Sequence, residues 1–488
     1  MAQRQRYVLL PSRGLRAESG PARSVLLEAS DAFHSLDGRV QLPDGTDFRV
    51  LDVTREDGPK LIEAETAVAM ALNEGQIPLR VVPVVEYRKP RIFPFAEMGL
   101  LKRATARALP SLTVRCVNAI DDDPVENAAV VAFTNFAERE GDGGKTDSNG
   151  EVTLRLAGGT IERLYIYGPP NYWGAYRENL AISNLTIGVT PVNLSYTDSV
   201  RHFYRQSRFN PATGVTVGVL DTGCDPHSDL NLLPGRATVT GEPDDTSDID
   251  LHGTHVAGLI GANGGLHGVA PGVPIRPYRV FPANGDGATN YAILKAMFAA
   301  ADARCDIVNL SLGGGPYDDI VAEAIQDARN QGMLVVVAAG NDNRATVNFP
   351  AAYPGAVAVA AMGIEGTFPS GSVEEADVLR PPYSQADASE FLAAFSNVGT
   401  EICVVAPGVG TLSTLPGQAY GPLSGTSMAA PVVAGATACL LSNDTATFGM
   451  PRNRARSDAI FNLLVQNCVR RRFGQIFEGF GLPDPASV

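Results

Sequence analysis

The feature that most constrains this chain is the alternation of apolar runs with helical patterns after residue 212. Apolar runs occupy residues 214–221, 306–312, 332–340, 356–362 and 401–407. Helical patterns between them include 290–303 and 319–332. Strands without polar alternation are buried on both faces, and strands that alternate with helices form parallel sheets. We therefore predict an α/β domain over residues 212–488 whose functional residues follow the carboxyl ends of its strands.

A small α/β module is predicted over residues 1–95. Strand-like patterns cover 7–13 and 48–53, a helical pattern covers 58–75, and a β-rich stretch covers 80–88. The following segment, 89–110, mixes proline with several lysines and arginines and is interpreted as a linker.

A β-sandwich is predicted over residues 111–198. Short runs of alternating polarity are separated there by turn signals, of which GDGGKTDSNG at 141–150 is the clearest. Short strands at this spacing are typical of a sandwich. A basic segment over 199–211 leads to the last domain.

Charge and hydropathy exclude several classes of partner. The formal net charge of −14 disfavours nucleic acid, because phosphate binding needs a basic surface. No apolar run approaches the roughly 18 residues of a membrane span. The apolar run at residues 7–10 is too short for a secretory signal, so we expect a cytoplasmic protein without a membrane partner. The six cysteines are scattered singly, which indicates neither a zinc site nor a disulfide framework.

Three chemically complementary residues stand at predicted strand or helix ends. Asp221 ends an apolar strand, His252 begins a helix, and Ser427 lies at the start of another. A serine hydroxyl is a weak nucleophile until a histidine accepts its proton, and a carboxylate fixes the histidine tautomer. Each signal alone is weak, but the chain order Asp, His, Ser is one of the orders in which such triads occur.

Five motifs then identify a family. DTG at 221–223, HGTHVAG at 252–258, LSLGGG at 310–315, AAGN at 338–341 and GTSMAAP at 425–431 resemble those of the subtilisin-like serine proteases, the subtilases. The resemblance covers about residues 212–485 and implies a parallel-sheet subtilisin-like fold.

The resemblance implies catalytic roles for four residues. Asp221 would orient the base, His252 would be the general base and then the general acid, and Ser427 would be the nucleophile. Asn341 would donate its side-chain amide to the oxyanion. His255 is then expected to be a structural neighbour, and Ser424 and Thr426 are interpreted as loop and cap hydroxyls.

The resemblance also implies a groove that binds substrate as an added strand. Its walls would be formed by Ser311, Leu312 and Gly313 on one side and by Gly285, Asp286 and Gly287 on the other, although NGDG also fits a plain surface turn. The first specificity pocket would lie near Gly313, Asp342 and Asn348. The carboxylate and amide of that pocket favour a polar or basic side chain before the scissile bond. Thr222 stands where the dibasic-processing branch has an acidic residue, so strict dibasic specificity is not expected.

We expect no cofactor and no tight calcium site. Asp229 matches a family ligand position, but the usual ligand loop is shortened within 255–272. One carboxylate does not make a site for a cation that needs six or more oxygens.

The first 200 residues are expected to keep the enzyme latent, as in a zymogen. Residues 1–95 weakly resemble a subtilase propeptide, and 111–198 resemble a carboxypeptidase regulatory-like domain. Because this second domain intervenes, the sequence leaves open whether self-cleavage occurs in 89–110, in 199–211 or not at all.

Three functions remain in competition at this point. The first is a serine endopeptidase that cleaves proteins or peptides through an acyl-enzyme. The second is a catalytically silent module that binds peptides, and the third is a transpeptidase related to subtilases. The presence of all four catalytic side chains favours the first, and no large insertion near the site supports the third.

Overall fold

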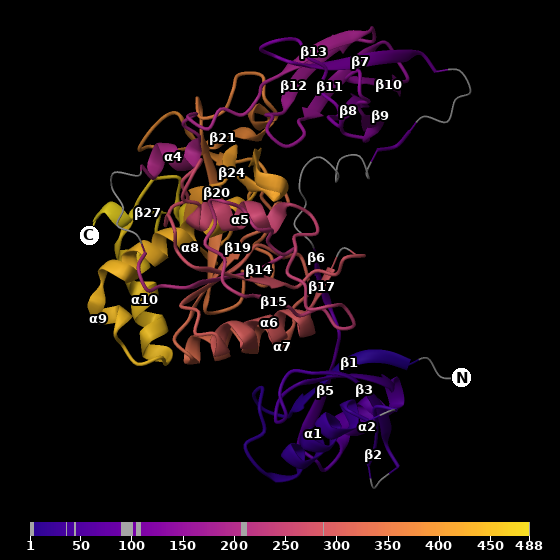
Figure 1. The fold of residues 1–488 in the computed structure, drawn as a ribbon, viewed down its shortest axis with the longest axis vertical. Helices are drawn as coiled ribbons and strands as arrows, with labels where there is room; N and C mark the ends of the chain where they lie inside the picture. The colour runs from indigo at the N-terminus through magenta and orange to yellow at the C-terminus, as the bar shows by residue number, and fades with distance from the viewer. Residues whose placement is uncertain are drawn as a thin grey trace.

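The structure of the chain is a computed structural model. It describes residues 4–35, 37–42, 45–88, 101–103, 109–205, 212–285 and 287–487. Figure 1 shows the large sheet of the C-terminal region in the centre, with the first strands of the chain below it and β7–β13 above it.

The N-terminal module is a five-stranded antiparallel sheet in the order β2-β3-β4-β1-β5. Its elements are β1 (Arg4–Pro11), α1 (Gly20–Phe33), β2 (Arg39–Gln41), β3 (Asp47–Val53), β4 (Lys60–Glu65), α2 (Thr66–Glu74) and β5 (Leu79–Pro83). The predicted helix over 58–75 is wrong in its first half, because β4 pairs with β1 on one side and β3 on the other. The helix α1 has no counterpart in the sequence prediction.

Residues 111–189 form two sheets packed around one apolar core. The first has the order β10-β7-β13 and the second β12-β11-β8-β9. Their strands are β7 (Ser111–Asn118), β8 (Ala129–Asn135), β9 (Glu140–Lys145), β10 (Glu151–Arg155), β11 (Thr160–Tyr167), β12 (Ala175–Ala181) and β13 (Leu185–Val189). The outer face of the second sheet carries aromatic residues that pack with Val373 and Ala376 of the C-terminal domain.

The C-terminal domain is built on a nine-stranded sheet in the order β15-β16-β14-β18-β19-β20-β22-β21, with β23 also paired to β20. Its strands are β14 (Val217–Asp221), β15 (Arg236–Ala237), β16 (Ile275–Arg279), β18 (Ile307–Leu310), β19 (Leu334–Ala338), β20 (Ala356–Ile364), β21 (Val378–Tyr383), β22 (Glu390–Ala393) and β23 (Ile402–Pro407). All pairs from β15 to β20, and the pair β20–β23, are parallel. The predicted parallel α/β class is confirmed.

Helices cover both faces of this sheet (Figure 1). The helices α5 (His252–Gly261) and α8 (Thr426–Asn443) belong to one apolar cluster, and α6 (Asn290–Asp302) and α7 (Asp319–Asn330) belong to a second on the other face. The remaining elements are α4 (Ser199–Phe203), η2 (Val373–Asp377), β24 (Thr411–Leu415), η3 (Pro416–Gln418), β25 (Ala419–Leu423), α9 (Thr445–Phe448), α10 (Arg454–Gln466), β26 (Cys468–Val469), α11 (Gln475–Glu478), β27 (Leu482–Pro483) and η4 (Pro485–Ser487).

One short strand of the N-terminal region leaves its own sheet. The β-rich stretch 80–88 divides into β5 and a separate strand, β6 (Glu86–Arg88). β6 pairs antiparallel with β17 (Gly287–Thr289) of the C-terminal domain, and Arg88 forms a further antiparallel bridge with Gly313. The N-terminal region therefore adds a strand between two segments of the C-terminal domain.

Candidate active site

Three neighbouring parallel strands end at one edge of the large sheet. β14 ends at Asp221, β18 is followed by Ser311, and β19 is followed by the segment that carries Asn341. Helices α5 and α8 begin at the same edge and supply His252 and Ser427. The chain thus brings together all four residues for which the motifs implied catalytic roles.

Glycines in two motifs allow α5 to approach β14. A Cβ atom added at Gly253 would lie 1.9 Å from the carbonyl oxygen of Gly223, so no larger residue fits without movement of the backbone. This close contact places Nδ1 of His252 2.7 Å from Oδ1 of Asp221. Oδ1 also accepts the backbone N–H of Thr222 at 2.7 Å.

The environment of His252 favours its cationic form. Burial opposes that charge, but the charge of Asp221 and its hydrogen bond to the ring outweigh burial, so the pKa of His252 is raised above its ordinary value. Nε2 of His252 is buried and has no hydrogen-bond partner among the described residues. That nitrogen is the group that a general base needs, and His252 and Ser427 line the same cavity.

Sequence reasoning did not single out Asp248, which supports this pair. Its carboxylate accepts the hydroxyl of Thr222 at 2.7 Å and both the backbone N–H and the hydroxyl of Thr254 at 2.7 and 2.6 Å. The Thr222 hydroxyl in turn accepts the backbone N–H of Gly253 at 3.0 Å. Burial raises the pKa of Asp248 despite these donors. The network ties the turn after β14 to the first turn of α5.

Ser427 lies in the first turn of α8, where unpaired backbone N–H groups and the helix dipole favour a developing oxyanion. Ser427 is 5% exposed, and its carbonyl accepts the Ser311 hydroxyl at 3.0 Å. Thr426 has a more specific role than the helix cap assigned to it from the sequence. Its backbone N–H and its hydroxyl each donate to Oδ1 of Asn341 at 2.9 Å. With its oxygen held in this way, Asn341 presents its amide nitrogen on the side of Gly425.

The other hydroxyl and the second histidine of the motifs form hydrogen bonds with the backbone. The Ser424 hydroxyl accepts the backbone N–H of Gly410 at 3.0 Å and so closes a loop. Nε2 of His255 lies 3.0 Å from the carbonyl of Thr411 and 3.1 Å from that of Gly421. Burial lowers the pKa of His255 to about 3, so its ring is neutral and joins two backbone segments.

The two predicted walls of the substrate groove face each other across β6. Gly287 of one wall pairs with Arg88, and Gly313 of the other accepts the Arg88 backbone N–H at 2.9 Å. Leu312 is buried at 2% exposure, and Gly285 lines a smaller cavity together with Gly287. Asp286 lies outside the described residues.

The predicted specificity pair is joined by hydrogen bonds. Oδ2 of Asp342 accepts the amide of Asn348 at 2.7 Å and that of Asn397 at 3.0 Å. A basic substrate side chain would therefore have to compete with two amide donors for this carboxylate. A basic preference before the scissile bond stays a prediction.

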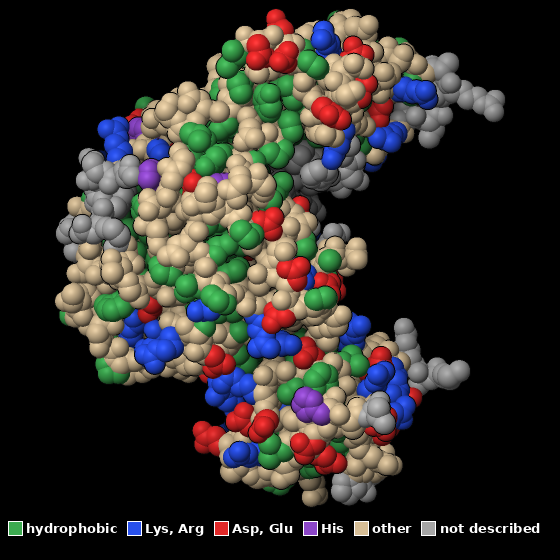
Figure 2. Space-filling model, in the orientation of Figure 1, with side chains coloured by type: hydrophobic (Ala, Val, Ile, Leu, Met, Phe, Trp, Pro, Cys, Tyr) green, Lys and Arg blue, Asp and Glu red, His purple; other side chains and the backbone are tan. Residues whose placement is uncertain are grey.

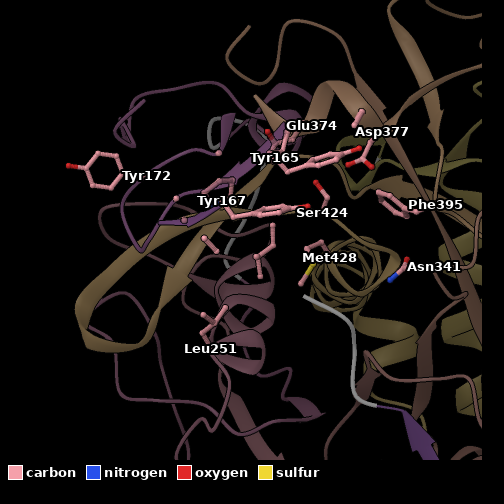
Figure 3. A pocket seen from close by; sticks show the side chains of 18 of the residues that line it. Tyr165, Tyr167, Tyr172, Leu251, Asn341, Glu374, Asp377, Phe395, Ser424 and Met428 are labelled. Atoms are coloured by element: carbon pink, nitrogen blue, oxygen red, sulfur yellow. The ribbon is translucent and has the colours of Figure 1, made fainter. Parts of the chain in front are cut away.

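A cavity of about 600 Å³ opens at the residues with predicted catalytic roles (Figure 3). His252, Asn341, Ser427 and Met428 line one part of it. The opposite part is lined by residues of the second β-sheet of residues 111–189, including Tyr165 and Tyr167 of β11. The sandwich therefore forms a wall of the cavity that His252 and Ser427 line, which no sequence motif indicated.

Asp229, which matches a calcium-ligand position of the family, is engaged by protein donors. Oδ2 of Asp229 accepts the backbone N–H of Leu266 and the hydroxyl of Tyr420, both at 3.0 Å, so protein donors engage the oxygen that a cation would need. Within the described ranges, no group of three or more His, Cys, Asp or Glu residues could hold a metal ion. That the chain needs no cofactor stays a prediction.

Comparison with known proteins agrees with the geometry. The model of the subtilase family matches residues 212–475. Subtilisin BL from Lederbergia lenta is 38% identical over 229 residues, which are 46% of this chain and 76% of that protein. Alkaline elastase YaB from Bacillus sp. (strain YaB) is 39% identical over 236 residues, 48% of this chain and 56% of the relative. Subtilisin DY from Bacillus licheniformis is 36% identical over 263 residues, 52% and 86% of the two chains.

These relatives overturn the expected cytoplasmic location. Subtilisins and alkaline proteases are secreted enzymes, so the comparison indicates an extracellular protein. In the part of the chain that the structure describes, no helix is long and apolar enough to cross a bilayer. From the family match over residues 212–475 and the shared identity, the chain belongs to the subtilase family and is a serine endopeptidase that acts on protein substrates.

Proposed function

We propose that the enzyme works through Asp221, His252 and Ser427 and is held latent by its own strand β6. In this mechanism Nε2 of His252 accepts the Ser427 proton as the hydroxyl attacks the scissile carbonyl. The resulting imidazolium is stabilised by Asp221, whose oxygen lies 2.7 Å from Nδ1. His252 then returns the proton to the leaving amine, and water hydrolyses the acyl-enzyme.

Asn341 is proposed to stabilise the oxyanion together with the backbone N–H of Ser427. The two hydrogen bonds from Thr426 support this role, because they fix the Asn341 oxygen and leave its amide to donate. Loss of one such donor typically lowers kcat by about 10²–10³-fold.

The observation that carries the latency proposal is the position of β6. Subtilase substrates bind as an added strand, and Glu86–Arg88 pairs with β17 on one side and bridges Gly313 on the other. A substrate cannot form the same pairs while this strand is present. The N-terminal region therefore competes directly for the groove.

Tyr87 anchors this strand. Its side chain is fully buried, and its hydroxyl lies 3.1 Å from that of Tyr353. The Tyr353 hydroxyl also accepts the backbone N–H of Asp318 at 2.6 Å. A Cβ atom added at Gly315 would meet the Tyr87 ring at 2.7 Å, so the glycine leaves the space that the ring fills.

Ion pairs hold the rest of the module against the catalytic domain. Lys295 of α6 lies 2.8 Å from Asp52, Asp302 of the same helix lies 2.5 Å from Arg55, and Glu323 of α7 lies 2.5 Å from Arg80. Figure 2 shows charged side chains of both signs where the two parts meet. These contacts keep β6 at a high local concentration next to the groove.

The register of β6 favours a self-cleavage site shortly after Arg88. The bridge between Arg88 and Gly313 is antiparallel. In a peptide that continues in this register, the residue two positions after the one opposite Gly313 would therefore lie opposite Ser311. Ser311 donates to the carbonyl of Ser427, so this position adjoins the nucleophile. We therefore propose a cut within residues 89–92.

The alternative segment, 199–211, is less suited to cleavage in its described part. Val200 is buried, and the Ser199 hydroxyl donates to the carbonyl of Val409 at 2.9 Å. Asp198 is bonded both to Arg201 and to the backbone N–H of Leu412. Residues 206–211 lie outside the described residues.

A fluorophosphonate probe tests the proposed nucleophile. It should label the incubated wild-type chain and leave Ser427→Ala unlabelled. A wild-type chain that stays unlabelled after prolonged incubation would support a silent peptide-binding module instead. Addition of an amine nucleophile during peptide cleavage tests transpeptidation, for which a product joined to the amine would have to exceed the hydrolysed product.

A further inference from the structure

We propose that the second sheet of residues 111–189 forms the part of the substrate groove that binds residues after the scissile bond, and that it selects large apolar or aromatic side chains there. This inference rests on the proposed function of Ser427 and its neighbours. It deepens that function by assigning specificity to a domain outside the family match, which begins at residue 212.

The cavity adjoins the proposed nucleophile and not the walls that β6 occupies. Gly287 and Gly313 are the walls that β6 already occupies, and they belong to the side before the scissile bond. Neither of them lines the 600 Å³ cavity. Ser427 and His252 do line it. A polypeptide that passes the nucleophile after lying against Gly313 therefore continues into this cavity.

Described residues that precede the sandwich lie near the site at two places. Arg88 lies beside Gly313 before the nucleophile, and the backbone N–H of Lys102 donates to the carbonyl of Arg139 at 2.8 Å beyond it. Arg139 lines the cavity. The chain's own described residues before the sandwich thus contact both the Gly313 wall and a residue of the cavity lining.

Aromatic and other apolar side chains line much of the cavity. On the sandwich side, Tyr165 and Tyr167 stack with ring centroids 6.1 Å apart, and Phe136 lies beside them. In Figure 3, Tyr167 extends toward Ser424 and Tyr165 toward Asp377. The catalytic side adds three more apolar residues to the lining, which are Phe395, Leu423 and Met428. Such walls bury an aromatic or large aliphatic side chain well.

The two buried carboxyls of the cavity do not favour a cationic occupant. Burial raises the pKa of Glu374, and burial together with the nearby Glu374 raises that of Asp377, so the neutral forms of both carboxyls are favoured. Arg163 lies over the Phe136 ring at 3.9 Å and Arg139 over the same ring at 4.4 Å. These cations are thus engaged with the aromatic wall itself.

Hydrogen bonds fix the sandwich to the catalytic domain. The backbone N–H of Tyr176 donates to the carbonyl of Gly371 at 2.7 Å, and Arg177 donates to the same carbonyl at 2.9 Å. The backbone N–H of Asn171 donates to the carbonyl of Tyr420 at 2.7 Å, and its side-chain oxygen accepts from Tyr420 at 2.9 Å. A wall held in this way can discriminate between substrates.

The test compares two kinds of substrate on enzyme that has been incubated without probe until withdrawn aliquots label completely. The labelled aliquots give the concentration of active sites, and the unlabelled enzyme is assayed. One is a fluorogenic amide with no amino acid after the scissile bond. The others are internally quenched peptides, identical before the bond, with Phe or Gly at each of the first three positions after it. We expect wild type to prefer a Phe peptide over its Gly counterpart by about tenfold in kcat/KM.

Tyr167→Ala should reduce this preference to about twofold and leave kcat/KM for the amide within about twofold of wild type. Phe136→Ala, at a half-buried position, provides a second variant if Tyr167→Ala also loses activity toward the amide. Ile120→Ala, on an exposed part of the sandwich that does not line the cavity, is the matched control and should keep the full preference.

An unchanged Phe preference in variants that cleave the amide normally would overturn the inference, as would a wild-type enzyme without the preference. Failure of the proposed function gives a different result, because wild type would then cleave neither the amide nor the peptides.

Discussion

Replacement of Tyr87 by alanine should release the enzyme from latency. Tyr87 is fully buried between Gly315 and Tyr353. A buried tyrosine covers about 150–250 Å², worth about 4–6 kcal/mol at about 25 cal/mol per Å². The alanine Cβ and residual packing retain part of this burial energy. Truncation of a buried aromatic side chain therefore costs about 3–5 kcal/mol. A loss of about 3 kcal/mol from the closed state corresponds to a change of about 100-fold in the fraction of open groove.

The initial rate at which a fluorophosphonate probe with a peptide arm labels Ser427 measures that open fraction, because the arm has to pair with the Gly287 and Gly313 backbone that β6 occupies. Full-length Tyr87→Ala should label about 100-fold faster than wild type, up to the rate of the unobstructed site. Phe33→Ala, at a position of the same module that is 38% exposed, should label like wild type. Equal initial rates for wild type and Tyr87→Ala would refute the assignment of β6 as the inhibitory strand.

Three further outcomes follow from the contacts of the site. Lys295→Met removes the cation bonded to Asp52, so initial labelling of the full-length chain should accelerate by about tenfold. A labelling rate equal to that of wild type would mean that this ion pair does not hold the N-terminal module. Thr426→Val removes one of the two donors that orient Asn341. The kcat on the fluorogenic amide should therefore fall by about tenfold with little change in KM. A change confined to KM would contradict the role of Thr426 in orienting Asn341. Catalysis needs neutral His252, and the pKa of His252 is raised. The value of kcat/KM should therefore rise with pH, with a midpoint above about 6.5, and activity should be lost at pH values below that midpoint. A midpoint below about 6.5 would show that Asp221 does not stabilise the imidazolium.

The catalytic domain is largely predictable from sequence because its signals are local. Apolar strands such as 334–338 have no polar face, and this pattern fits only a doubly covered sheet. The motifs around Asp221, His252 and Ser427 combine chemistry with the glycines that permit close packing. Asp248 could not be predicted in this way, because it contacts Thr222 and Thr254 only in the folded chain and no local sequence pattern marks it.

The N-terminal half was harder to predict for two physical reasons. Residues 60–65 read equally well as part of a helix, and only the pairing of β4 with β1 and β3 makes them a strand. The stretch 80–88 looks like one strand, yet its two halves pair with different sheets. The cavity wall formed by Tyr165 and Tyr167 likewise depends on how two domains pack, which neither of their sequences encodes alone.

The most direct test of the central claim, that Ser427 is the nucleophile and β6 fills its groove, is mass spectrometry of the incubated full-length chain beside Ser427→Ala. We predict that wild type releases an N-terminal fragment ending within residues 89–92, and that Ser427→Ala remains intact under the same conditions. The same fragment from Ser427→Ala would contradict the assignment of the nucleophile. A wild-type cut confined to 199–211 would contradict the placement of β6 before the scissile bond.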